Sequence, residues 1–498
     1  MISSLIYLSI VAIVAIATLI GRFWPFAKVK TRAVFQTGAV WLSLGLVVLV
    51  WVSNCVSMPT KGFMSFYADR LSWVMATLIL FVSAIIHHFS IYYMSGDALY
   101  SKFFLLLGAV TVFSLGFVAQ DHLLLYPLFL GLSNYCLVQL MIHKSGWKPA
   151  YSAGLTAAKY LGAAILSLFI SSFIIGQSSG IWFLHELSSY KSDSIVSLLI
   201  SSCIVVGALL QSANMPFHGW VASSLNSPTP VSALMHAGLV NAGGYLLVRF
   251  SGILQEHAYL MAALFVVGFI TSLLGIFWKL VQSDVKRMLA YSTIAQMGFM
   301  SMQCALGLFA PAIAHICLHG LFKAYLFLQS GSTVSQTRLY PDLTNRTIPA
   351  LFVALCLGAV SATFFGYIAH FSWYTTEVFL IGFCFLAMSQ LALVFLEKRL
   401  GLLELVLALL VSLTFAGIYG LSISCIEKTL SFSFLSVTPT WYHWAVFAVV
   451  AAMWTYMNLP AFLRLQHSQL YKRLYVWALV KSQPAKECVT STRQIYQY

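Results

Sequence analysis

Three titratable side chains recur at intervals of four residues in an otherwise apolar segment. They are His315, His319 and Lys323, in the run HICLHGLFK. Residues at this spacing share one face of an α-helix, so two imidazoles and one ammonium group form a stripe. Ionisable side chains at membrane depth cost about 2.5–3.5 kcal/mol each near a helix centre, and they often mark ion pathways. The stripe therefore indicates ion translocation; the alternative is that the three groups hydrogen-bond to neighbouring helices and hold them together.

A second polar segment runs from Gln211 to His236 and contains His218; Gln211 and His218 are candidates for a supporting role. Pro216 removes a backbone donor directly after a long apolar run, and two further prolines stand at 228 and 230. The prolines predict a helix broken in the middle of the membrane, of the type that lines polar cavities in transporters. A helix end followed by a tight polar loop is the alternative. His236 fits either a proton relay or a buried histidine whose hydrogen bonds are satisfied.

Four further ionisable residues are candidates for a supporting role. Asp284 lies in a charged loop that opens a polar-faced helix, and a solvated turn is the alternative there. Asp69 opens another helix, where its carboxylate is expected to cap the first turn. Lys159 lies inside an apolar stretch, and Glu377 begins a later one.

The composition of the chain predicts that these residues lie on or between transmembrane helices. The chain has 498 residues, of which 60% are hydrophobic and 8% are charged, whereas soluble proteins carry about 25% charged residues. Fifteen apolar stretches lie between residues 3 and 458, each about long enough to cross a membrane. A soluble protein is excluded, and so is a β-barrel, because stretches such as 33–56 are continuously apolar and do not alternate. The sequence predicts an all-α, polytopic membrane helix bundle with about 14–15 transmembrane helices.

Charge sets the expected topology. We divide the chain into N-terminal helices (1–64), a core (65–396), C-terminal helices (397–458) and a basic amphipathic tail (459–498). Most of the 27 Lys and Arg residues fall in alternate connections and in the tail, which places them on the cytoplasmic side of the inner membrane and the N-terminus outward. The net charge of +14 is thus attributed to topology and not to nucleic-acid binding. The tail is expected to lie on anionic membrane lipid or to dock a soluble subunit.

Nothing in the sequence indicates catalysis or a bound cofactor. The nine cysteines are scattered without a CxxC pair, and no GxGxxG, P-loop or nucleophile-elbow motif is present. His315 and His319 have no nearby carboxylate or thiolate in the sequence to complete a metal site. We therefore expect no catalytic residue, cofactor or metal in this chain.

Four segments resemble the antiporter-like membrane subunits of respiratory complex I and of Mrp cation antiporters. They are QSANMPFHGW, SPTPVSALMHA, DVKRMLAYSTIAQMG and HGLFKAYLFLQSGS, and the resemblance extends over about 65–395. It implies a core of two five-helix repeats of inverted topology, each with one broken helix, and a hydrated proton route along the membrane plane. His236, His315, His319 and Lys323 are the retained ion-translocation residues of that route.

The chain departs from the proton-pumping members of that family at charged positions. Gln211 stands where those members have a lysine, and no acid lies near 128–131 on the fifth helix, where the glutamate partner of that lysine would fall. A second lysine of the family would fall near Tyr367, which is a further candidate for a supporting role. Loss of both members of a buried ion pair is physically consistent, because loss of one member would strand an uncompensated charge. The outer half of the route is thus partly dismantled and its middle is kept.

One branch of the family combines these features, namely DabB, the membrane subunit of two-component inorganic carbon transporters. That branch also lacks the long lateral helix of the pumping subunits, and this chain carries a short basic tail instead. The resemblance implies a subunit that admits H⁺ or Na⁺ to drive a carbonic-anhydrase-related partner, DabA, on the cytoplasmic side, with zinc in the partner. Two alternatives stay open: a proton-translocating subunit of complex I, a hydrogenase or an Mrp antiporter, and a scaffold that only anchors a partner.

Overall fold

The computed structural model of the chain describes residues 2–24, 27–53, 65–190, 194–332, 347–396, 401–430, 437–459 and 468–489. These residues form α-helices joined by turns and short 3-10 segments, and two isolated bridges link Phe66 to Gln120 and His122 to Phe183. Among the described residues, eleven helical stretches are long and apolar enough to cross a membrane, one of them being the stretch 229–249, and two shorter apolar helices accompany them. The prediction of an all-α, polytopic membrane protein is confirmed.

The chain forms two compact units. The first unit comprises residues 1–302, 315–334 and 482–498, and the second comprises 303–314 and 335–481. The helices of the first unit are α1 (Ile2–Phe23), α2 (Val29–Val52), α3 (Arg70–Tyr93), α4 (Tyr100–Ala119), α5 (Leu125–Met141), α6 (Lys148–Ser179), α7 (Ser194–Gln211), α8 (Gly219–Ala222), α9 (Thr229–Ala237), α10 (Ala242–Arg249), α11 (Ser251–Leu254) and α12 (Ala258–Leu280).

Two helices have residues in both units. Most of α13 (Val285–Ala305) and of α14 (Phe309–Gln329) belongs to the first unit. The second unit holds α15 (Ile348–Ile368), α16 (Glu377–Leu396), α17 (Leu402–Leu430), α18 (Trp441–Asn458) and α20 (Gln469–Lys481). Each of the fifteen predicted apolar stretches overlaps a described helix, and the stretch 229–249 holds two helices, α9 and α10. Helix is expected where a backbone in lipid must satisfy its own hydrogen bonds.

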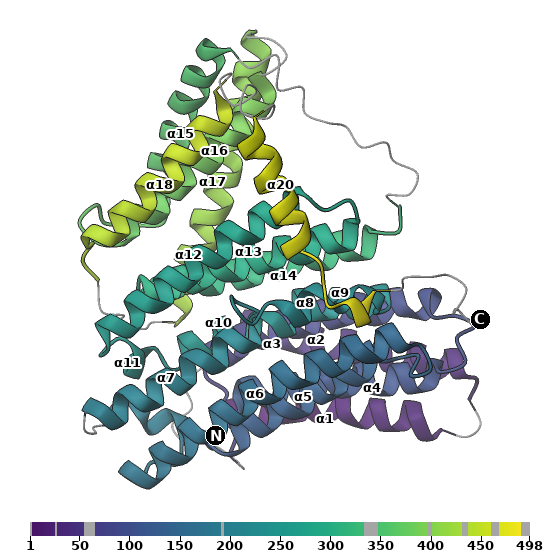
Figure 1. The fold of residues 1–498 in the computed structure, drawn as a ribbon. Helices are drawn as coiled ribbons and strands as arrows, with labels where there is room; N and C mark the ends of the chain where they lie inside the picture. The colour runs from purple at the N-terminus through teal and green to yellow at the C-terminus, as the bar shows by residue number, and fades with distance from the viewer. Residues whose placement is uncertain are drawn as a thin grey trace. The chain divides into compact units, whose positions relative to one another are not determined.

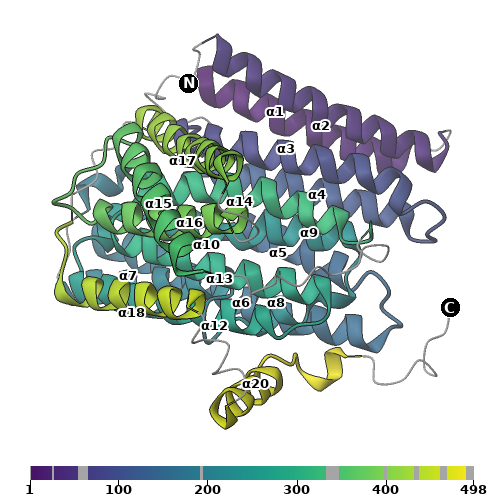
Figure 2. The same ribbon diagram turned by 90° about the horizontal axis from the view of Figure 1, so that it is seen from above.

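Within the first unit, consecutive helices pack side by side. α1 and α2 lie against each other along one edge and contact α4 and α3 (Figure 2), and α5, α6 and α7 follow in order. α10 approaches α7 closely, because a Cβ atom on Gly243 would lie 2.3 Å from the carbonyl oxygen of Ala208. This close approach requires glycine, and it brings the end of α7 against the segment before α10.

Local sequence signals explain where several helices begin. The carboxylate of Asp69 accepts a hydrogen bond from the backbone N–H of Ser72 at 2.8 Å, so the predicted cap of α3 is confirmed. The Thr347 hydroxyl accepts from the backbone N–H of Ala350 at the start of α15. Both side chains satisfy donors that the first helical turn leaves without a partner.

The helical structure is interrupted at two places near the predicted site. After α7 ends at Gln211, helix resumes only as the short α8, as Pro216 predicts. The second interruption was not predicted: the stretch 229–249, expected as one helix, is divided into α9 and α10 by residues 238–241. Gly238 lies at this break with φ −115° and ψ −86°, and a Cβ there would come within 2.8 Å of the Leu234 carbonyl oxygen. We call residues 238–241 the α9–α10 break.

In the second unit, α15, α16 and α17 pack together (Figure 1). Their contact is formed by small and branched side chains, among them Ala354, Ala392, Leu393 and Ala408. Near the end of α18 the amide of Asn458 donates to the Gln390 side chain of α16 at 3.1 Å.

Candidate functional site

His236 and His319 come from different helices to one buried region of the first unit. The His236 ring of α9 stacks on Phe327 of α14, with ring centroids 4.2 Å apart and an interplanar angle of 8°. His319 of α14 meets the α9–α10 break, where its Nδ1 atom lies 3.1 Å from Oδ1 of Asn241. The two imidazoles are therefore held where α14 passes the break.

Lys323 is the most deeply buried member of the predicted stripe. Its side chain is 1% exposed, and Nζ donates to the Leu289 carbonyl of α13 at 3.2 Å. None of the described side chains forms an ion pair with it. His315 lies one turn before His319, with ring centroids 6.0 Å apart, and is also buried.

The stripe thus faces protein and not lipid, but its role stays a prediction. The bonds of His319 to the break and of Lys323 to α13 also tie helices together, as the structural alternative requires. The free ring atoms favour a polar path: among the described residues, none gives a hydrogen-bond partner to His236 Nδ1 or His319 Nε2. Buried polar atoms are usually bonded to protein or water, so these two nitrogens are suited to exchange a proton with a water molecule.

Gln211 is fully buried in a reciprocal pair of amides. Asn134 of α5 donates to the Gln211 side-chain oxygen at 2.9 Å, and Gln211 donates back to the Asn134 oxygen at 3.1 Å. A second donation from Gln211 reaches the carbonyl of Leu239 in the break at 3.1 Å. The pair places an uncharged amide where the resemblance implies a lysine. Its partner is residue 134 of the fifth helix, which lies beyond 128–131, where the family's glutamate would fall.

Polar contacts connect the two amides to the histidines. Ser212, next to Gln211, donates to the carbonyl of Val240 at 2.8 Å, so the end of α7 is bonded to two carbonyls of the break. Asn241, the last residue of the same break, contacts His319. One series of polar groups therefore runs from α5 through α7 and the break to α14.

The predicted supporting residues of the first unit occupy different settings. Asp69 is buried and forms an ion pair with Arg249, which also donates to the Val118 carbonyl at 3.2 Å. Asp284 is exposed and accepts from the backbone N–H of Arg287 at 2.8 Å, which matches the solvated-turn alternative. Lys159 is exposed on α6. The His218 ring is half-buried against Trp278, with centroids 5.1 Å apart.

Tyr367 and Glu377 belong to the second unit, whereas the four predicted ion-translocation residues belong to the first. Tyr367 is 80% exposed on α15. Glu377 accepts from the backbone N–H of Ser372 at 2.6 Å and from the Thr375 hydroxyl at 3.0 Å, so it organises the turn before α16.

A cleft of about 770 Å³ opens at one end of the first unit. It is lined by the α3–α4 and α5–α6 connections, by the residues before α9 and by the start of α13. Its ionisable residues include a His143–Asp97 pair, with Nε2 and Oδ1 3.0 Å apart, and Lys286, which donates to the Ser227 carbonyl at 3.3 Å. The cleft therefore adjoins the start of α9, the helix that carries His236.

Residues 482–488 of the tail bind the same end of the first unit. Ser482 is buried; its carbonyl accepts from the Tyr291 hydroxyl at 2.6 Å, and its hydroxyl accepts from the Gln282 amide at 2.8 Å. Asn226 donates to the Cys488 carbonyl at 2.7 Å. We call residues 482–488 the tail clasp.

Sequence reasoning missed two site residues, Asn134 and Asn241. Both are amide side chains inside otherwise apolar stretches, and both are nearly fully buried. The cost of burying an unpaired amide was the available signal. It identifies such residues but not their partners.

Comparisons with known proteins identify the family of this chain. Residues 119–397 match the family model described as NADH:quinone oxidoreductase/Mrp antiporter, transmembrane, and residues 60–104 match that of the complex I chain 5 N-terminus. The chain belongs to this family. It is a multi-pass membrane protein, and its curated DabB relatives are named as transporter subunits.

Within the family, the chain is similar to curated DabB proteins. It is 32% identical to the "Probable inorganic carbon transporter subunit DabB" of Bacillus anthracis, over 85% of this chain and 84% of the relative. It is 36% identical to DabB1 of Halothiobacillus neapolitanus over 58% of this chain and 53% of the relative. NADH-ubiquinone oxidoreductase chain 5 of Cryptococcus neoformans is 30% identical, over 68% of this chain and 52% of that protein.

A solved structure shows the same fold. The Mrp complex from Dietzia sp. DQ12-45-1b matches with a TM-score of 0.60 and 21% identity, over 97% of this chain and 52% of the matched chain. The expected antiporter-like fold is therefore confirmed. The chain spans about half the length of this neighbour and of the DabB1 and chain 5 relatives.

Proposed function

We propose that this chain is the ion-conducting membrane subunit of an inorganic carbon uptake system in the inner membrane. It admits H⁺ or Na⁺ down its gradient to drive a carbonic-anhydrase-like partner. The curated DabB relatives support the system, because they are named for inorganic carbon transport. The observation that carries ion conduction is the buried row of His236, His319 and Lys323, together with His315, at the α9–α10 break.

The neutral pair of Gln211 and Asn134 supports this role over that of a proton pump. An amide pair holds the helices together through hydrogen bonds, but it cannot gain or lose charge at neutral pH. A pump of the complex I or Mrp type would need a titratable group there. A subunit that lets ions flow downhill needs only the retained central groups.

The cleft beside α9 is the proposed cytoplasmic opening of the ion path. Its lining connections carry Lys144 and Lys286, and the positive-inside rule assigns such connections to the cytoplasm. The N-terminus then faces outward. We expect a cysteine in place of exposed Glu256, beyond α11, to react with an impermeant maleimide in intact cells. A cysteine in place of exposed Asp284 should react only after the cells are opened, and the reverse result would overturn the orientation.

The partner is a DabA-like subunit on the cytoplasmic side that carries the zinc and hydrates CO₂. Affinity purification of the tagged chain, followed by metal analysis of what co-purifies, tests this assignment. A large zinc protein is the expected result. A set of quinone-oxidoreductase subunits would instead favour the complex I alternative.

Substitution of Lys323 by Met tests the ion path. The variant removes the amino group that bonds to Leu289 but keeps an unbranched apolar side chain of similar length. We expect Lys323→Met to insert in the membrane at normal levels and to lose growth under limiting CO₂. Lys102→Met is the matched control, since Lys102 is exposed on α4 and is not a candidate site residue. Unchanged growth of Lys323→Met would contradict the proposed role.

A further inference from the structure

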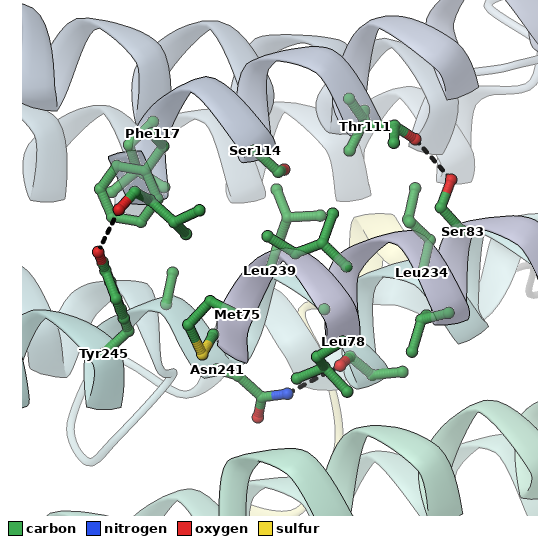
Figure 3. Close-up of a pocket in the computed structure, with 18 residues that line it drawn as sticks. Met75, Leu78, Ser83, Thr111, Ser114, Phe117, Leu234, Leu239, Asn241 and Tyr245 are labelled. Atoms are coloured by element: carbon green, nitrogen blue, oxygen red, sulfur yellow. Dashed lines mark hydrogen bonds between the residues drawn. The ribbon is translucent and has the colours of Figure 1, made fainter. Parts of the chain in front are cut away.

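A cavity of about 60 Å³ lies inside the first unit, beside the α9–α10 break (Figure 3). Its walls come from α3, α4, α5 and the residues around the break, and every lining residue is buried or half-buried. Aliphatic side chains such as Leu78, Val82, Val110 and Leu234 form much of the surface. None of the four central ion-path residues lines it.

The polar side chains around the cavity already have protein partners. Ser83 and Thr111 bond to each other at 2.6 Å, and the Tyr245 hydroxyl donates to the Val118 carbonyl at 2.7 Å (Figure 3). Asn241 donates to the Ala237 carbonyl at 2.8 Å, and Ser114 bonds to Ser133 at 2.8 Å. These bonds leave the cavity with a predominantly apolar surface.

Such a surface selects the kind of molecule that fits. A buried water molecule requires two to four polar partners, whereas an apolar cavity of about 150 Å³ stays dry and takes benzene or xenon. The present cavity is less than half that size, so it suits one apolar molecule of a few heavy atoms.

We propose that this cavity binds one molecule of CO₂, an inference that rests on the proposed role in inorganic carbon uptake. CO₂ has no hydrogen-bond donor and no net dipole, so it fits a site whose polar groups are already satisfied. The cavity borders Leu239 and Asn241, whose contacts reach Gln211 and His319. Bound CO₂ therefore lies against the same break that carries the ion-path contacts.

Crystals of the full chain pressurised with xenon test the cavity without any variant. We expect one xenon peak between Val82, Val110 and Leu234, and we expect CO₂ under pressure to replace it. Val110→Phe should fill the space and abolish the peak. Val112→Phe is the matched control: the same substitution, two residues along α4, at a position that does not line the cavity.

Ordered water, a lipid chain or no density in the cavity of the native chain would overturn the proposal, as would xenon that CO₂ does not replace. Transport measurements on two variants distinguish a role of the cavity in CO₂ binding from a role in ion conduction. Val110→Phe should raise the CO₂ concentration needed for half-maximal uptake by several fold, with ion conductance in liposomes unchanged. Lys323→Met should lose conductance but keep the xenon peak. An unchanged CO₂ requirement in a folded Val110→Phe variant would contradict a role for the cavity in uptake.

Discussion

Gln211 occupies the position at which the resemblance implies a lysine. In the structure its amide is satisfied on both sides, by Asn134 and by the Leu239 carbonyl. Satisfied amides stabilise a buried contact, whereas an ionised side chain in the same place needs a counter-charge. The position has thus become a structural bond between α5, α7 and the α9–α10 break.

We predict that Gln211→Lys destabilises the protein by about 3–5 kcal/mol, the cost of an uncompensated buried charge. The double variant Gln211→Lys with Asn134→Glu should recover part of this loss, because the two new charges face each other. Thermal unfolding of the purified variants in detergent measures both effects.

Gln211→Leu separates the charge effect from the loss of hydrogen bonds. It should cost about 1–3 kcal/mol, since it leaves the Asn134 amide without its partner. Higher coupled transport by the single lysine variant would argue against the neutral-pair interpretation and for a pump.

At the scale of elements, the sequence predicted only one of the two helix interruptions near the site. Pro216 predicted the end of α7, because proline lacks a backbone donor. The α9–α10 break contains no proline, and its signal was Gly238 within an otherwise continuous helical pattern. A single glycine is tolerated in many helices, so its backbone geometry had to be observed.

The partners of buried amides were likewise beyond the sequence. Asn134 lies 77 residues from Gln211, and Asn241 lies 78 residues from His319. Helical spacing predicts neighbours three or four residues apart, as it did for His315, His319 and Lys323. Which helices meet depends on the packing of the whole bundle, so only the stripe could be placed in advance.

The tail clasp binds α13, the helix whose Leu289 carbonyl accepts the hydrogen bond from Lys323. Tyr291, which binds Ser482, lies two residues after Leu289, the acceptor for Lys323. We predict that Tyr291→Phe lowers the free energy of unfolding by about 1–3 kcal/mol, because the buried Ser482 carbonyl loses this donor. Backbone hydrogen exchange in residues 482–488 should also become faster than in the native chain.

Tyr475→Phe provides the control for that measurement. Tyr475 is 42% exposed on α20, so its variant should leave both the unfolding free energy and the exchange of the clasp unchanged. Equal exchange in the two variants would mean that the clasp is held by its other contacts, from Gln282 and Asn226.

At the scale of the whole molecule, the connections expected on the cytoplasmic side meet in space. The α3–α4 and α5–α6 connections, the residues before α9 and Lys286 line one cleft, and the tail clasp binds Asn226 and Tyr291 at the same end of the first unit. Charge alternation along the sequence therefore identified loops that the fold brings together. It did not identify the clasp, whose contacts are made by uncharged groups.

The partner surface is predicted to include the tail. α20 exposes Leu470, Val476 and Val480 together with basic Lys472 and Arg473, a combination suited to a soluble subunit or an anionic lipid surface. We expect a chain ending after residue 458 to insert in the membrane, because α1 to α18 precede that point, and to retain less of a tagged partner.

A chain ending after residue 489 is the matched control, because it keeps both α20 and the tail clasp. Partner yield should then equal that of the full chain. If the shorter truncation also keeps the full yield, the partner must bind the connections that line the cleft, and α20 only contacts lipid. If both truncations lose the partner, residues 490–498 carry the contact, since their loss is the one change that the two chains share.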